Sequence, residues 1–340
     1  MAVTSETPRL SVIVPTLGWS RWLADCLDAL RRQTGGEGAD WRLEIILVSQ
    51  GEGRLNHRKH RAEELADVIL QLDENTGFAS ANNYGLRAAR GEYLATVNDD
   101  AIVEDGWCEA LLTALDRDES LAAAQGVNLQ LDEPSRIDGA GLAWNRHWQA
   151  VQIGHGERLE ALSEAFTETP TEIFGVSATA AIYRRSALAK VSGPHLAAFD
   201  DRLFAYYEDV DLACRLRAAG YRALRVPEAR ARHAGSLSGQ RLAGGKRRLI
   251  TRNRHLVLAN MLGRRFWLLL PRILARDLAD LWRAGERRDR ETIAGILGGL
   301  GGALRRGPRF SRLGPSTIPS SELEAFITGP SEIEPLGTDR

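Results

Sequence analysis

Residues 93–100 read YLATVNDD, a short apolar run that ends in one asparagine and two aspartates. Similar apolar runs precede it at residues 10–14, 43–48 and 68–72. Each run has the length and the β-branched content of a buried strand, and helical spacing of apolar residues separates them. Strands that alternate with helices predict an α/β fold on a mostly parallel sheet.

Polar residues follow each of these runs. They are Pro15 and Thr16, Ser49 and Gln50, residues 73–75, and residues 98–100. In open α/β sheets, ligands bind at the carboxyl ends of the strands. The sequence therefore predicts a ligand site along one rim of the sheet.

Beyond residue 130 the pattern is less regular. We predict irregular structure over residues 130–180, interrupted by a strand at 174–184. A short helix at residues 185–191, a helix at 208–219 and a strand at 222–226 follow. From about residue 241 the pattern is helical and basic.

Composition excludes several classes of protein. With 340 residues, of which 44% are hydrophobic, the chain can bury a sizeable core. Three widely spaced cysteines exclude a zinc-binding CxxC pair and a disulfide framework, and they favour a reducing cytoplasm. The N-terminus lacks the pattern of a signal peptide, and no apolar run has the length of a membrane span.

The charge is unevenly distributed, although the net charge is only −1. Residues 240–312 hold 18 Lys and Arg against 5 Asp and Glu, a net of +13, which leaves −14 for the rest. Such a segment predicts a basic surface for an anionic partner. No recognised nucleic-acid motif accompanies it, so we expect no nucleic-acid partner.

The motif Asn98-Asp99-Asp100 follows a predicted strand. Carboxylates suit Mg²⁺ or Mn²⁺, and a divalent cation can neutralise a departing diphosphate. The alternative is an ordinary turn or helix cap, which Asn and Asp also favour.

Three acids, Glu208, Asp209 and Asp211, open a predicted helix. One of them can serve as the base that takes a proton from a hydroxyl, and the neighbouring aromatic residues would raise its basicity by excluding water. The alternative is a favourable interaction of the acids with the helix dipole.

Two further signals are weak when taken alone. His233 follows the last predicted strand, where it can be a metal ligand or a surface residue. Asn75 and Gly77 precede a helix, where backbone N–H groups can bind an anion, but a plain helix start would look similar.

Taken in order, these segments resemble family 2 glycosyltransferases, especially the bacterial rhamnosyltransferase-like branch. The resemblance covers about residues 9–240. The matching segments are Ser11-Val12-Ile13-Val14-Pro15-Thr16, Asn75-Thr76-Gly77-Phe78-Ala79, Ala88-Ala89-Arg90-Gly91-Glu92-Tyr93, Asn98-Asp99-Asp100, Phe199-Asp200-Asp201-Arg202-Leu203-Phe204, Tyr207-Glu208-Asp209-Val210-Asp211-Leu212 and Arg217-Ala218-Ala219-Gly220-Tyr221.

The resemblance implies a GT-A fold and an inverting single displacement that depends on Mn²⁺ or Mg²⁺. The donor would be a nucleotide diphosphate sugar, dTDP- or UDP-linked, and the acceptor a glycan or lipid-linked glycan of the cell envelope. Asp100 matches the metal-binding acid, His233 the histidine that completes the metal site, and Asp209 the catalytic base. The donor-binding positions would be Pro15, Thr16, Gln50, Asn75, Gly77, Asn98 and Asp99.

The chain departs from the family at Ser49-Gln50, where relatives usually have an acid that contacts the donor's base or ribose. One alternative is therefore a binding protein of the same fold with impaired catalysis. A second is a sugar-phosphate nucleotidyltransferase, which should carry a glycine-rich basic loop after the first strand. Here Thr16-Leu17-Gly18-Trp19 has one glycine.

The resemblance and the composition together predict three regions. Residues 9–240 would form the catalytic domain, 241–312 a basic helical region and 313–340 a flexible tail. Within the second region, Trp267, Leu270, Leu274, Leu278, Leu281 and Trp282 lie on one helical face with arginines beside it. This stripe predicts a helix that lies on an anionic membrane at its cytoplasmic face. The alternative is that it packs on the catalytic domain or on a second subunit in a homodimer.

Overall fold

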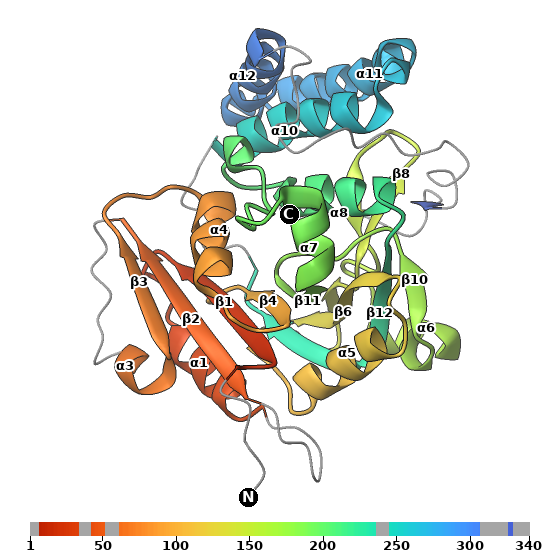
Figure 1. Ribbon diagram of the computed structural model, residues 1–340. Coiled ribbons are helices and arrows are strands. Elements are labelled where there is room, and N and C mark those ends of the chain that lie inside the picture. Colours follow the sequence, from red (N-terminus) through yellow and green to blue (C-terminus); the bar gives the residue numbers. More distant parts are fainter. Residues whose placement is uncertain (1–6, 34–41, 52–60, 236–244, 307–325, 329–340) are drawn as a thin grey trace, which may run out of the picture.

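The computed structural model describes residues 7–33, 42–51, 61–235, 245–306 and 326–328 (Figure 1). The strands are β1 (Leu10–Thr16), β2 (Leu43–Gln50), β3 (Val68–Leu72), β4 (Tyr93–Val97), β5 (Ala101–Val103), β6 (Leu121–Gln130), β7 (Ile137–Gly139), β8 (Leu142–Asn145), β9 (Ala150–Gln152), β10 (Thr171–Ile173), β11 (Ala180–Arg184), β12 (Arg222–His233) and β13 (Ile327–Thr328). The helices are α1 (Leu23–Arg31), α3 (Ala62–Leu65), α4 (Phe78–Ala88), α5 (Trp107–Asp116), η1 (Leu159–Ala161), α6 (Glu164–Glu168), α7 (Arg185–Ser192), η2 (Asp201–Leu203), α8 (Glu208–Ala218), α10 (Gly245–Leu262), α11 (Arg265–Glu286) and α12 (Arg290–Arg306).

Ten of the described strands form one sheet. Eight of them lie in the order β10-β12-β6-β11-β4-β1-β2-β3, while β5 pairs with β12 and β7 pairs with β6. The pairs β1–β2, β1–β4, β2–β3 and β6–β12 are parallel. Strand β11 runs antiparallel to both of its neighbours, so its first residue, Ala180, lies opposite Val97 at the end of β4. The loop before β11 therefore reaches the rim where the parallel strands end.

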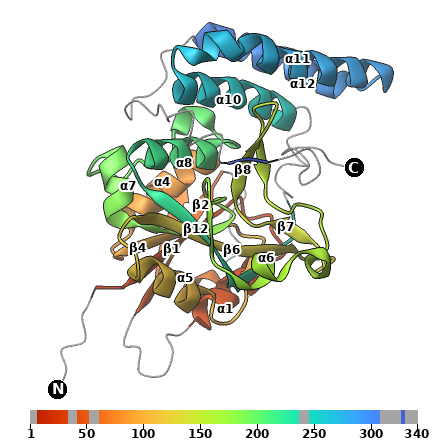
Figure 2. The ribbon, with the colours of Figure 1, turned by 90° about the vertical axis from the view of Figure 1, so that its right-hand side faces the viewer.

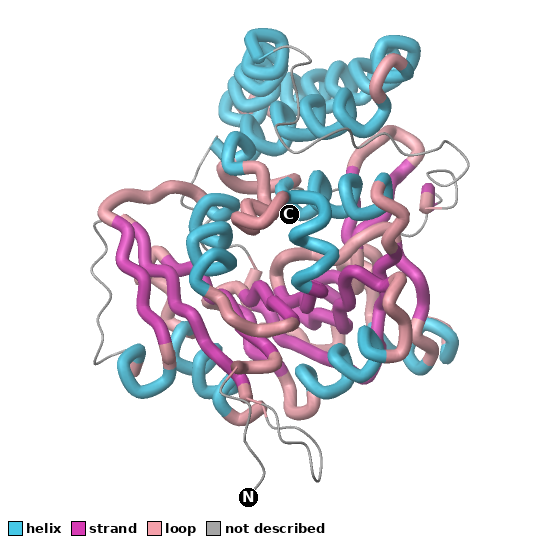
Figure 3. Tube along the Cα trace, viewed as in Figure 1, coloured by secondary structure: helices cyan, strands magenta, loops and turns pink. Residues whose placement is uncertain are grey.

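Helices cover both faces of this sheet (Figures 1, 2 and 3). One buried cluster joins Leu27 of α1 and Trp107 of α5 to one face. A second cluster joins Leu86 of α4 and Leu212 of α8 to the other face. Full burial of an apolar side chain of this size contributes about 1.5–3 kcal/mol.

Helix α4 lies very close to β1 because Gly85 has no side chain. A Cβ at this position would lie 2.4 Å from Cγ2 of Ile13. Glycine inside a helix lowers the free energy of unfolding by about 0.5–1 kcal/mol relative to alanine. The close packing of α4 on β1 therefore has a cost in stability. It fixes the N-terminus of α4 above the rim of the sheet.

The α/β fold and its mostly parallel first half are confirmed. Strands predicted at residues 68–72 and 93–97 are β3 and β4. The predicted strand at 174–184 is wrong in its first part, since β11 begins only at Ala180. There the Ser177 N–H donates to Gln125 Oε1 at 2.7 Å, so a side chain replaces a strand neighbour.

Two other expectations need correction. Residues 130–180 contain β7 to β10 and α6 as well as irregular loops. The last strand does not end at Val226, because β12 continues to His233 across a register shift between Arg225 and Arg230. Pro227 lies in this shift, where a residue without an N–H is tolerated.

Helices α10, α11 and α12 form a layer beyond α8 (Figures 1 and 2). Val257 and Leu258 of α10 share a buried cluster with Val210 of α8. Helix α11 runs through Pro271 without ending there. None of the helices in the described ranges has both the length and the apolar character needed to cross a membrane.

The three-region division stays a prediction. Its first boundary, at residue 240, lies outside the described residues. Of the predicted tail, the structure describes only residues 326–328, where β13 pairs with β8.

Candidate active site

The rim motif Asn98-Asp99-Asp100 lies between β4 and β5, and β12 brings His233 to it. The pairing of β5 with β12 places His233 opposite Ala101, and the Ala234 N–H donates to the Asp100 carbonyl at 3.1 Å. As a result, His233 Nε2 lies 3.1 Å from Asp100 Oδ1. Both side chains are buried.

Asp138 of β7 is a partner of His233 that the sequence did not reveal. Its Oδ2 lies 2.9 Å from His233 Nδ1. Burial alone would lower the pKa of His233, but the charges of Asp138 and Asp100 raise it well above the usual range. Burial would likewise raise the pKa of Asp138, but His233 lowers it below its ordinary value. A carboxylate on one ring nitrogen orients the other nitrogen toward a metal.

The residues present fit a divalent cation. Carboxylate and imidazole are both ligands for Mn²⁺, and Asp100 and His233 offer one of each. Next to them, Asn98 Nδ2 lies 3.4 Å from His233 Nε2, while Asn98 Oδ1 is buried without a hydrogen-bond partner. Among the described residues there is no preformed group of three or more His, Cys, Asp or Glu ligands. The protein would thus supply two ligands, and diphosphate oxygens and water would complete the shell.

Asp99 turns away from this pair and connects two strand ends. Its Oδ2 accepts a hydrogen bond from Thr16 Oγ1 at 2.5 Å, and its carbonyl accepts one from Ser20 Oγ at 3.0 Å. Burial and the neighbouring charge of Asp100 raise the pKa of Asp99 to about 7, although the Thr16 hydroxyl acts in the opposite direction. Pro15 lies inside β1, opposite Val48.

Gln50, the last residue of β2, forms a second group along the rim with Asn75 and Gly77, which follow β3. Gln50 Oε1 accepts hydrogen bonds from both the N–H and the hydroxyl of Thr76, each at 3.1 Å. Asn75 Oδ1 accepts one from the Gly77 N–H at 3.0 Å. Gly77 has φ 88° and packs against Phe204, where a Cβ would lie 2.5 Å from the Phe204 ring. Gln50, at the position of the usual acid, thus supports the loop that precedes α4.

Asp209 lies in the first turn of α8 and faces the loop before β11. Its Oδ2 accepts a hydrogen bond from the Ala178 N–H at 3.4 Å, and Oδ1 accepts one from Val210 at 2.8 Å. The next residue of that loop, Thr179, accepts the Asn98 N–H at 2.8 Å through its carbonyl. One short loop therefore connects the predicted base to the predicted metal motif.

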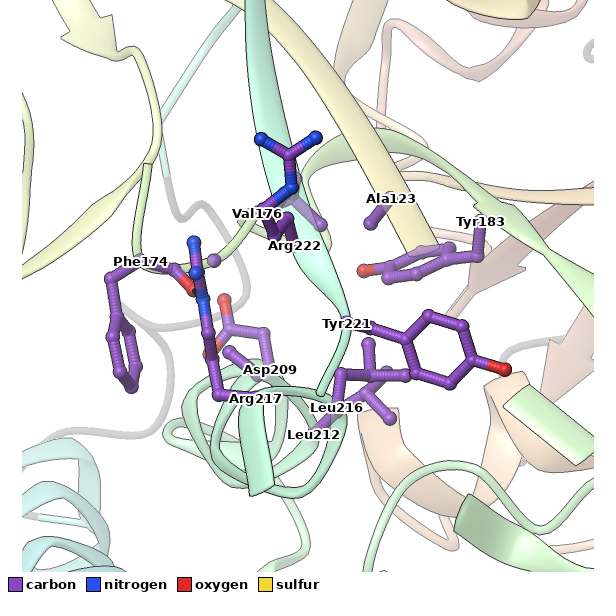
Figure 4. Close-up of a pocket in the computed structure, with 13 residues that line it drawn as sticks. Ala123, Phe174, Val176, Tyr183, Asp209, Leu212, Leu216, Arg217, Tyr221 and Arg222 are labelled. Carbon is purple, nitrogen blue, oxygen red and sulfur yellow. Dashed lines mark hydrogen bonds between the residues drawn. The ribbon is translucent and has the colours of Figure 1, made fainter. Parts of the chain in front are cut away.

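The surroundings of Asp209 are largely apolar. It lines a pocket between α8 and the sheet together with Val176, Tyr183 and Leu212 (Figure 4). Burial raises the pKa of Asp209, although the N–H groups of Val210 and Ala178 partly offset the effect. A carboxylate in such a place is a stronger base than one in water.

Comparisons with known proteins identify the family of the chain. Residues 11–192 match the model of glycosyl transferase family 2. The chain belongs to this family. The match assigns no role to single residues and ends before Asp209 and His233, so the roles of Asp100, Asp209 and His233 all stay predictions.

Similar proteins include the O-antigen biosynthesis protein RfbC of Myxococcus xanthus, 26% identical over 248 residues, which are 68% of this chain and 18% of RfbC. The N-acetylglucosaminyltransferase of Azorhizobium caulinodans is 26% identical over 239 residues, 66% of this chain and 55% of that protein. The putative glycosyltransferase EpsH of Bacillus subtilis is 30% identical over 115 residues, 32% of this chain and 30% of EpsH. The chain thus spans less than two thirds of the length of each of these relatives.

Two solved structures share the fold. GalNAc-T7 with UDP, GalNAc and Mn²⁺ aligns with a TM-score of 0.53 at 16% identity, over 75% of this chain and 51% of that one. The mannosyltransferase PcManGT of Pyrobaculum calidifontis, in complex with GDP-Man and Mn²⁺, aligns with a TM-score of 0.50 at 20% identity, over 95% of this chain and 80% of that one. The fold of this family 2 chain is of the GT-A type, with C-terminal helices added.

Proposed function

We propose that this chain is an inverting, metal-dependent glycosyltransferase that moves a sugar from a nucleotide diphosphate to a hydroxyl of a glycan or lipid-linked glycan. The observation that carries the proposal is the loop before β11. Its Ala178 N–H binds the desolvated Asp209 and its Thr179 carbonyl binds Asn98, two residues from Asp100. The same loop therefore holds the proposed base and the motif that contains the proposed metal ligand Asp100.

In the proposed reaction Asp209 removes the proton of the acceptor hydroxyl. The acceptor oxygen forms a bond to the anomeric carbon, while the bond from that carbon to the diphosphate oxygen breaks on the opposite face. The electron pair leaves with the nucleoside diphosphate, and the anomeric configuration inverts. Partial exclusion of water around Asp209 favours the proton transfer.

Asp100 and His233 would hold Mn²⁺ or Mg²⁺, and Asp138 would orient the imidazole. When bound, the cation neutralises charge that develops on the leaving diphosphate. Asp99 and Thr16 keep the end of β1 next to the end of β4, which positions the rim for the nucleotide.

For the donor we propose a dTDP- or UDP-sugar, with rhamnose as the first sugar to test. The support is the order of motifs shared with rhamnosyltransferase-like enzymes. Gln50 is neutral where relatives usually have an acid, and its Oε1 supports Thr76. Base and ribose recognition in this chain therefore relies on groups other than a carboxylate at this position.

For the acceptor we propose a cell-envelope glycan presented near an anionic membrane. RfbC is named as an O-antigen biosynthesis protein, which supports the choice of glycan. Helix α11 supports the choice of surface, because Trp267, Leu278 and Trp282 are 59%, 64% and 71% exposed. The buried side of α11 is instead formed by Phe266, Ile273, Asp277 and Ala284. Of the predicted stripe, Leu270 packs partly against the buried cluster, so only Trp267, Leu278 and Trp282 are exposed. These exposed apolar side chains, with arginines beside them, fit a helix that lies in lipid headgroups.

Nucleotide release from a panel of dTDP-, UDP- and GDP-sugars, with and without Mn²⁺, tests the proposal. We expect one donor to release nucleotide, EDTA to abolish the release and Mn²⁺ or Mg²⁺ to restore it. Binding of UDP or dTDP without turnover of any donor would instead support a catalytically impaired binding protein. Release that EDTA does not affect would remove the metal from the proposal.

A further inference from the structure

The loop between η2 and α8 has an unusual backbone. Phe204, Tyr206 and Tyr207 have φ angles of 67°, 66° and 71°, in the left-handed region. Residues with a Cβ seldom adopt this backbone conformation, and those with bulky side chains adopt it least often. Such a conformation persists only where surrounding contacts hold it in place.

This loop contacts both halves of the candidate active site. On the donor side, the Phe204 carbonyl accepts the Ala79 N–H at 3.0 Å, and the Phe204 ring packs against Gly77. On the other side, the loop leads directly into α8, where the Tyr207 carbonyl accepts the Asp211 N–H at 2.9 Å. Its conformation therefore sets where Asp209 lies relative to the loop that contains Gly77.

Further contacts that hold the loop come from α10, in the outer helical layer. Asn253 is fully buried, and its Nδ2 lies 2.9, 2.9 and 2.7 Å from the carbonyl oxygens of Leu203, Ala205 and Tyr206, which share its two N–H donors. These three carbonyl oxygens can only accept hydrogen bonds. The side-chain amide of Asn253 must therefore point its nitrogen, and not its oxygen, toward them.

Arg252 fixes the orientation of this amide. Its Nε donates to Asn253 Oδ1 at 2.8 Å, which identifies that atom as the oxygen. Its Nη2 also donates to the Leu203 carbonyl at 2.9 Å. Two consecutive residues of α10 thus bind the start of the strained loop.

We propose that Asn253 is a positioning residue, which holds the loop 204–207 in its left-handed conformation and thereby sets the place of the base Asp209. The inference rests on the proposed role of Asp209. Helix α10 would thus affect catalysis without contacting the substrate.

The first test is Asn253→Ala, measured by nucleotide release with the donor that turns over in the panel. We expect kcat to fall about tenfold to a hundredfold, the scale of a base misplaced by about 1 Å. Asn260→Ala changes the same residue type two turns along α10 and should leave kcat unchanged. Mn²⁺ affinity should stay the same in both, because Asp100 and His233 lie on other elements.

The second test distinguishes positioning from simple packing. Glycine adopts positive φ at no steric cost, so Tyr206→Gly should restore at least part of kcat when added to Asn253→Ala. A residue that only stabilises the fold would lower the melting temperature without this rescue. If Asn253→Ala does not fold, Asn253→Ser retains one donor and is measured with the same Tyr206→Gly partner.

The outcomes separate the two proposals. A wild-type kcat in folded Asn253→Ala, with severe loss in Asp209→Asn, would overturn the positioning role and leave the base in place. An Asp209→Asn variant with full turnover would overturn the proposed base itself. If both act on one step, the double variant should be no slower than Asp209→Asn alone.

Discussion

The rim of the sheet and the outer helix α11 depart from the usual distribution of residues in opposite ways. At the rim, Asp100 and His233 are buried, whereas on α11 Trp267 and Trp282 are exposed. A buried charge is costly unless it is paired, and the rim supplies its pairs from within the chain. An exposed apolar stripe has no such internal partner. This difference underlies our proposal of a small charged ligand for the rim and a large surface for α11.

We expect the largest effect from a substitution at the rim that leaves α11 unchanged. Asp209→Asn should cut kcat by at least about a hundredfold, the scale for loss of a general base, while donor binding is retained. Asp201→Asn, an exposed acid before the same helix, is the matched control and should behave like the wild type. Equal activity of the two variants would exclude Asp209 as the base.

The next effect concerns the partner of His233. Asp138→Asn should weaken Mn²⁺ binding about tenfold to a hundredfold, because the imidazole loses the carboxylate that orients it. Titration of Mn²⁺ in the presence of UDP or dTDP measures this directly. Asp132→Asn, an exposed acid nearby, should bind Mn²⁺ normally. Unchanged affinity in Asp138→Asn would show that the ion pair is only structural.

The pH dependence tests whether the pocket around Asp209 stays dry. The base must be deprotonated, so kcat should fall as the pH drops through the pKa of Asp209. Because burial raises that pKa, the acid limb should lie above the ordinary aspartate value of about 3.9. The profile is taken at saturating Mn²⁺, and a limb that moves with Mn²⁺ concentration would report metal binding instead. A limb near the ordinary value would mean that water reaches Asp209.

The smallest effect addresses the outer surface. Trp267→Ser combined with Trp282→Ser should reduce sedimentation with anionic vesicles several-fold, but should leave turnover on a soluble acceptor unchanged. High salt should release the wild type, since a basic residue near an anionic leaflet contributes about 1 kcal/mol. Tyr84→Ser changes an exposed aromatic residue of α4 and serves as the control. Wild-type protein that ignores anionic vesicles at low salt would make α11 a packing or dimer helix.

The parts of the fold that depend on local pattern could be predicted from the sequence. Strands β3 and β4 begin and end where their apolar runs do, since β-branched residues and flanking turn residues mark both limits. Strand β11 was expected six residues too early, because residues 174–179 look apolar although Gln125 and Asp209 bind their backbone. Such side-chain contacts across the sheet leave no trace in a local pattern.

The same reason explains which site residues the sequence did not reveal. Asp100, Asp209 and His233 belong to recognisable motifs, and the structure brings Asp100 and His233 together. Asp138 lies alone between Ile137 and Gly139, and only the pairing of β7 with β6 places it beside His233. Asn253 belongs to a basic helix, and its burial against three carbonyls depends on how α10 packs.

The distance along the chain between Asp100 and His233 has a consequence for biosynthesis. The ribosome must add 133 residues after Asp100 before His233 exists, and Asn253 follows 20 residues later. At elongation rates of about 5–20 residues per second this interval is on the order of 10 s. During that time the nascent chain can pair β1, β2 and β4, but it cannot yet hold a cation through both ligands. If Asp100 and His233 hold the metal as proposed, a product truncated before residue 233 should bind Mn²⁺ more weakly than the full chain, even where β1, β2 and β4 have paired.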